Sequence, residues 1–151
     1  MSGEPTIRAR IKTVMDTVSG VGQVYTRERW ASDWAAYLSA FKATVSGADY
    51  IRGWTIACEA AIRGEGDFGD TNVERTYRFR IRGYYGLDDA AASENAAFAL
   101  TEAVMDALDA DATLHSYYSA PPCSCPVFEL RMYGDVLCHY MEIEQEVTVI
   151  V

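Results

Sequence analysis

The chain has 151 residues, of which 50% are apolar, with a formal net charge of −9 and a pI of about 4.6. This length fits one domain with its own core, and the composition excludes a chain that is disordered throughout. The acidic balance argues against sequence-independent nucleic-acid binding, which needs Lys and Arg to neutralise phosphates, and no stretch approaches the roughly 18 apolar residues of a membrane span.

Cysteine usage and the first residues predict an intracellular, reduced chain. The cysteines are Cys58, Cys123, Cys125 and Cys138, and the first six residues lack the basic start and apolar run of a secretory signal. Reduced thiols in a cytoplasmic compartment are therefore expected.

Two helices are predicted in the first third of the chain. The first lies between Pro5 and Gly20, where apolar residues recur at helical spacing: Ile7, Ile11, Val14, Met15 and Val18. A short strand is one interpretation of the link from Gly20 to Tyr25. A second apolar stripe follows at Trp30, Trp34, Tyr37, Leu38 and Phe41. Packing of these aromatics in the core is favoured over an exposed docking patch.

A long β-hairpin is predicted next. Residues 54–62 alternate as a half-buried strand, and residues 75–86 form a second strand whose apolar side chains alternate with Arg78, Arg80 and Arg82. The glycine-rich segment Gly64–Asn72 joins them and predicts a mobile loop. Its acids, Glu65, Asp67 and Asp70, allow a calcium loop as an alternative, but they lack the EF-hand spacing and its terminal Glu.

The remaining elements complete an α+β fold. A helix is expected from Asp88 and Asp89, which would cap its first turn. A loop is expected from Asp109 to Pro126, followed by a strand over residues 127–133. The last strand alternates Met141, Ile143, Val147 and Val149 with Glu142, Glu144, Glu146 and Thr148. The prediction is a single α+β domain over residues 1–151, with a mixed or antiparallel sheet and helices packed on one face.

Two charged stripes stand out. Three arginines, Arg78, Arg80 and Arg82, share one strand face, and three glutamates, Glu142, Glu144 and Glu146, share another. They could be two solvated surfaces. They could instead pair on neighbouring strands within one subunit, or meet between subunits in a head-to-tail contact. The sequence leaves the three alternatives open.

Catalytic and metal chemistry have little support, so no catalytic residue, metal or cofactor is predicted. Cys123, Cys125, Cys138 and His139 are soft ligands, but their spacing is unlike that of zinc sites, and adjacent strand residues point to opposite faces. Neither histidine has a nucleophile in a recognisable setting. A small enzyme or ligand-binding module that uses His139 and Glu142 is kept as the alternative.

Four segments, taken in order, resemble the tail-terminator, or tail-completion, proteins of tailed bacteriophages. The segments are Gln23–Trp34, Ile51–Ile56, Tyr77–Glu94 and Arg131–Ile143. The resemblance implies a structural virion protein that is not an enzyme, made in the host cytoplasm and placed in the neck. It implies a ring, commonly of six copies, which caps the head-proximal end of the tail tube and ends its growth. Another neck or head–tail connector protein is the nearest alternative.

The same resemblance implies the partners: other copies of the chain, the tail tube protein and the head-side connector or stopper protein, with DNA passing through the lumen without specific binding. No membrane is involved. The subunit or tube contact is assigned to both charged stripes and to the loop residues Glu65, Asp67, Phe68 and Asp70. Reversal of Arg80 to Glu is expected to impair docking and to leave the fold intact.

Overall fold

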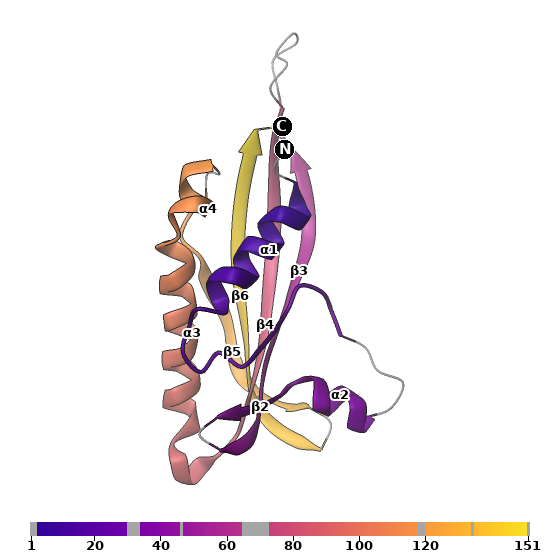
Figure 1. Ribbon diagram of the computed structural model, residues 1–151, viewed down its shortest axis with the longest axis vertical. Coiled ribbons are helices and arrows are strands. Elements are labelled where there is room, and N and C mark those ends of the chain that lie inside the picture. Colours follow the sequence, from indigo (N-terminus) through magenta and orange to yellow (C-terminus); the bar gives the residue numbers. More distant parts are fainter. Residues whose placement is uncertain are drawn as a thin grey trace.

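The protein is described from a computed structural model, which covers residues 3–29, 34–45, 47–64, 73–117, 120–133 and 135–150. A mixed sheet of six strands forms its centre, and the two longest helices lie side by side on one face of that sheet (Figure 1). In chain order the elements are α1 (Glu4–Met15), β1 (Gln23–Tyr25), α2 (Trp34–Ala40), β2 (Lys42–Val45), β3 (Ala48–Arg63), β4 (Glu74–Gly86), a 3₁₀ turn η1 (Asp89–Ala91), α3 (Ser93–Asp109), α4 (Ala112–Tyr117), β5 (Ser124–Tyr133) and β6 (Val136–Ile150). The predicted α+β class is confirmed.

The sheet has the order β1-β3-β4-β6-β5, and β2 pairs with the first residues of β3. β1 runs parallel to β3, and the other pairs are antiparallel. The predicted long hairpin is β3 and β4, whose register shifts at a bulge between Cys58 and Ala60. β4 pairs with β6 along its whole length, so β4 and β6 are the central strands.

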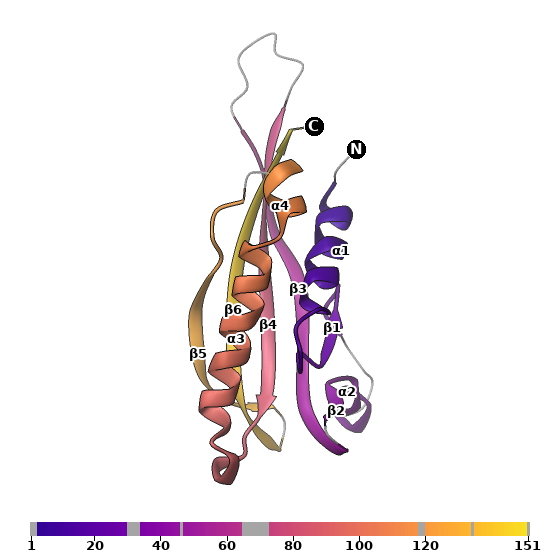
Figure 2. The same cartoon turned by 60° about the vertical axis from the view of Figure 1, so that its left-hand side comes forward.

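The main hydrophobic core lies between this sheet and the helices α1 and α3 (Figure 2). Each element contributes the apolar half of its alternating or helical pattern: Ile7, Ile11, Met15, Trp54, Ile56, Phe79, Ile81, Ala97, Val104, Leu108, Met141 and Ile143 are almost wholly buried. Trp54 is the largest of them, and its indole Nε1 donates to the Val21 carbonyl at 2.9 Å. Gly83 faces the Trp54 ring, and a Cβ at that position would lie 2.5 Å from it. The bulky side chain therefore requires glycine on the neighbouring strand.

A smaller cluster lies on the opposite face of the sheet and fixes α2. Phe41, just after that helix, is buried against Tyr84 and Tyr133, with edge-to-face ring contacts of 5.7 and 5.4 Å. Gly53 leaves the space for the Phe41 ring, since a Cβ there would lie 2.4 Å from it. The expectation that helices pack on one face thus holds for α1 and α3, while α2 contacts the other face because Leu38 and Ala40 pack in this cluster with Phe41.

Local structure departs from the sequence-based prediction at several places, among them the end of α1 at Met15, before Val18, and the start of β5 at Ser124. The segment 109–126 was expected to be a loop but contains α4, whose first turn is capped by Asp111 through a 2.9 Å bond from the Leu114 N–H. β2 was not predicted. Asp88 does cap a turn, but that turn is η1, and α3 begins only at Ser93, after Ala92 with a positive φ of 51°.

None of the helices in the described part of the chain has the length and apolar character needed to cross a bilayer. Two predictions fall outside the described residues. One is the packing of Trp30 in the core. The other is the interface role of the loop residues Glu65, Asp67, Phe68 and Asp70.

Candidate functional site

The two charged stripes lie side by side on neighbouring strands and pair within one chain. β4 and β6 set the register, which places Arg78 opposite Glu146, Arg80 opposite Glu144, and Arg82 opposite Glu142. We call these six residues the Arg–Glu ladder. Of the three alternatives left open by the sequence, the structure thus supports pairing within the subunit.

Arg80 is the centre of the ladder because it contacts three carboxylates. Its two terminal nitrogens bind Glu142 and Glu144, each at 2.9 Å. Its Nε lies 3.0 Å from Glu59, an ion-pair contact whose direction does not suit a hydrogen bond. Arg82 contacts the same Glu59 at 3.0 Å and reaches Glu28 at 2.6 Å, which ties the segment after β1 to this face. The guanidinium groups of Arg80 and Arg82 therefore each neutralise carboxylates from more than one segment of the chain.

The ladder is more exposed at its Arg78 end than around Arg80. The Arg78 side chain is 57% exposed and its bond to Glu146 faces solvent, whereas the side chains of Arg80 and Glu142 are only 30% and 11% exposed. Burial by itself would raise the pKa of Glu142, but the hydrogen bond donated by the Tyr140 hydroxyl and the charge of Arg80 outweigh it, so the pKa lies below its ordinary value. Glu142 therefore remains ionised, and the Arg80–Glu142 contact is a structural ion pair.

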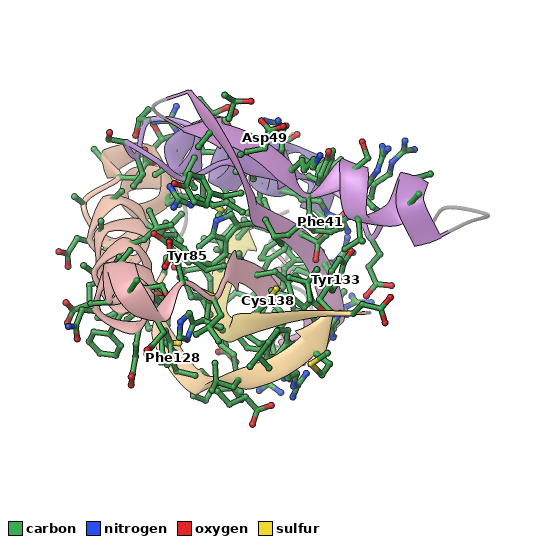
Figure 3. All side chains as sticks on the ribbon, turned by 90° about the horizontal axis from the view of Figure 1, so that it is seen from below. Phe41, Asp49, Tyr85, Phe128, Tyr133 and Cys138 are labelled. Atoms are coloured by element: carbon green, nitrogen blue, oxygen red, sulfur yellow. The ribbon has the colours of Figure 1, made fainter. Side chains whose placement is uncertain are left out.

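A row of exposed and half-buried apolar side chains lies where α3 meets β5, and sequence reasoning missed it as a surface. Phe128, Leu130 and Met132 share one face of β5, and Phe98 on α3 and Leu87 stand beside them; we call these five residues the apolar row. Phe98, Leu130 and Met132 are 50%, 54% and 61% exposed. Phe98 packs edge-to-face on Phe128 at 5.4 Å. Figure 3 shows Phe128 at this edge of the molecule, beside α3.

The apolar row borders a hollow of about 470 Å³ at the start of α3, lined by Leu87, Ser93, Glu94, Phe128, Leu130 and His139. The row also borders the outer edge of the sheet. β5 pairs only with β6 among the described strands, so its other edge offers unpaired backbone N–H and C=O groups. An apolar surface and an open strand edge therefore meet at one place.

Ser93 and His139 form a buried polar contact at the floor of this hollow. The Ser93 hydroxyl lies 2.9 Å from His139 Nε2 and accepts a bond from the Asp88 N–H, also at 2.9 Å. Burial lowers the pKa of His139, and the charge of Glu94 only partly opposes this effect, so the imidazole is neutral at pH 7. This geometry ties the turn before α3 to β6, and it also resembles a hydroxyl held by a base.

The alternative site built on His139 and Glu142 is not assembled by the fold. His139 lies on the face that α3 covers, with Phe128 stacked against it, whereas Glu142 lies on the ladder face. The two cannot act on one bound molecule, because side chains three residues apart on a strand point to opposite faces.

The cysteines are separated in the same way. Cys123 belongs to the main core and Cys138 to the cluster around Phe41, and burial raises their thiol pKa values to about 12 and about 11. All four cysteines are free thiols. Buried thiols with raised pKa values are poor nucleophiles and poor metal ligands.

No protein-family model matches the chain, and no curated protein matches it.

Proposed function

We propose that the protein is a structural assembly subunit of the phage tail-terminator type, which forms a ring at the head-proximal end of the tail tube. The observation that carries this proposal is the apolar row beside the open edge of β5. Four of the seven large apolar side chains that are exposed in the described residues, namely Leu87, Phe98, Leu130 and Met132, belong to this one region. A gathered apolar surface of this kind is typical of a protein contact.

The Arg–Glu ladder was expected to make subunit or tube contacts, but it supports the proposal as an internal brace of the sheet. Because its guanidinium groups are neutralised by carboxylates of their own chain, this face needs no external anion. The ladder stiffens the central strands β4 and β6 and leaves the sheet edges as the surfaces available for docking. A direct role of Arg78, Arg80 and Arg82 in subunit or tube contact stays a prediction.

The more specific assignment rests on the four ordered sequence segments that resemble tail terminators, together with the charge. Six copies would carry a formal charge of −54, six times the −9 of one chain. An acidic ring repels the phosphates of DNA in its lumen, which favours passage over binding. The partners in this proposal are further copies of the chain, the tail tube protein and the head-side connector.

The experiment uses the full chain and a candidate tail tube protein from the same genome. Light scattering and native mass spectrometry are expected to give one closed ring stoichiometry. Adding the ring to polymerising tube protein should stop growth at one end, as seen by negative-stain microscopy. A chain that stays monomeric alone and with tubes contradicts the proposal. Neighbouring genes for a tube protein and a tape-measure protein provide an independent check.

A second candidate is favoured by the Ser93–His139 contact in its hollow: a small hydrolase or ligand-binding module. Hydrolysis of p-nitrophenyl acetate that is lost in both Ser93→Ala and His139→Gln would favour it. If the wild type and both variants hydrolyse the ester only at the uncatalysed rate, the Ser93–His139 contact has a structural role alone.

A further inference from the structure

We propose that the apolar row of one copy receives the outer edge of β3 of a second copy, so that subunits join head-to-tail through opposite edges of their sheets. This inference rests on the proposed assembly function and names the surfaces that carry it.

The receiving surface is apolar at its centre and acidic at its rim. Glu94, Phe98 and Glu102 are spaced four residues apart on α3, so they form one row along the helix, and all three are exposed. Neither glutamate makes an ion pair with a described residue. Residues 87–133 contain eight acidic residues and one basic residue, Arg131. This side therefore fits a partner with an apolar centre and basic flanks.

The backbone of the receiving side adds a second element of recognition. Pro126 stands at the register shift between Ser124 and Val127, and from Val127 to Tyr133 the strand pairs regularly with β6. A regular strand with one open edge is the template for addition of another strand.

The opposite edge of the same sheet, formed by β3, has complementary apolar and basic character. β1 covers β3 only as far as Thr55, so from Ile56 to Arg63 the outer edge of β3 has no partner strand among the described residues. Its exposed residues Ala61, Ile62 and Arg63 combine small, apolar and basic character. The neighbouring segment 3–29, which includes α1 and β1, contains five basic and three acidic residues. Arg8, Arg10 and Lys12 form ion pairs within the chain, so Arg63 and the net positive balance of this segment give this edge its basic character.

The placement of these two surfaces decides the symmetry. Figure 2 shows α3 and β5 toward one edge of the sheet and α1 and β3 toward the other, with both helices on the same face. A two-fold contact through the apolar row would bring Glu94 and Glu102 of both copies together, and such like-charge contacts are costly. Joining opposite edges instead pairs acidic with basic groups, and a repeated head-to-tail contact of this type closes into a ring when its rotation allows.

The test mixes two variants that each lose one of the two surfaces. Phe98→Asp spoils the α3–β5 side and leaves the β3 edge intact, while Ala61→Glu/Arg63→Glu spoils the β3 edge and leaves the α3–β5 side intact. Each variant alone is expected to associate about 30-fold more weakly or worse, as when a central contact of an interface is lost. Mixed together, they should form a 1:1 dimer that grows no further, because one intact contact remains.

Native mass spectrometry reads the outcome, and circular dichroism confirms that each variant is folded. Ile150→Asp is the control, since Ile150 is 67% exposed and lies on neither surface, and it should assemble like the wild type. A mixture that stays monomeric, or a Phe98→Asp variant that still forms rings, overturns the inference. If the wild type forms rings in the same experiment, the proposed function still stands. A wild-type chain that never assembles removes both.

Discussion

Replacing Arg80 by Met tests whether the Arg–Glu ladder stabilises the fold. Met retains much of the apolar stem and removes the charge, which leaves Glu59, Glu142 and Glu144 close together without their shared cation. Loss of one partner of a fully buried pair costs about 3–5 kcal/mol, and a charged hydrogen bond contributes about 1.5–3 kcal/mol. Because Arg80 is partly exposed, we expect a loss of about 2 kcal/mol in the free energy of unfolding.

The matched control is Arg78→Met, which removes a solvent-facing pair worth about 0–1 kcal/mol. Urea unfolding followed by fluorescence measures both variants, and Arg80→Met should also melt roughly 4–8 °C below the wild type. Adding Glu142→Gln to Arg80→Met should recover part of the loss, because one uncompensated carboxylate is removed. Equal effects of the Arg78 and Arg80 substitutions, or no recovery in the double variant, would refute the central role of Arg80.

The ladder also changes an expectation drawn from the sequence. Reversal of Arg80 to Glu was expected to leave the fold intact, but it would place a fourth carboxylate among three. We now expect that variant to be less stable than Arg80→Met, so impaired assembly of it would not report on docking alone.

Three further predictions concern the core, acid stability and the turn before α3. Gly83→Ala should cost about 2 kcal/mol in urea unfolding because its Cβ would meet the Trp54 ring, whereas Gly86→Ala, with its nearest contact at 3.5 Å, should cost much less; equal costs would speak against the packing described. The lowered pKa of Glu142 means that its ionised form stabilises the fold above the ordinary carboxyl pKa, and that this contribution disappears as the pH falls through the lowered value. Glu142→Gln should therefore flatten the fall in unfolding free energy as the pH drops below the ordinary glutamate pKa, and an unchanged slope would contradict the assignment. Ser93→Ala should destabilise the chain by about 1–2 kcal/mol, since the Asp88 N–H loses its acceptor, and a neutral result would show that this bond contributes nothing.

The central strands were predictable because their patterns are regular. Residues 77–82 of β4 and 141–149 of β6 alternate apolar with polar or charged side chains, apart from Gln145, and one face of each strand is buried under α1 and α3. The helix α3 followed from its apolar spacing. Pairing between the two charged stripes depends on which strands are neighbours, and a single sequence does not contain that information.

The remaining features depend on tertiary packing. α4 is six residues long and is fixed by Asp111, which also binds Arg10, a residue 101 positions earlier in the chain. Phe128, Leu130 and Met132 alternate as core residues do, but only Phe128 packs against the core, and Leu130 and Met132 are exposed because β5 is the last strand of the sheet. The position of Phe98 outside the buried stripe of α3 was the one local signal of this surface.

Native mass spectrometry of the wild-type chain over residues 1–151 tests whether this protein is a self-assembling subunit. We expect one closed oligomer with a single copy number at micromolar concentration, and we expect Phe98→Asp to lose it. A monomer at every concentration, alone and with tail tubes, would contradict it.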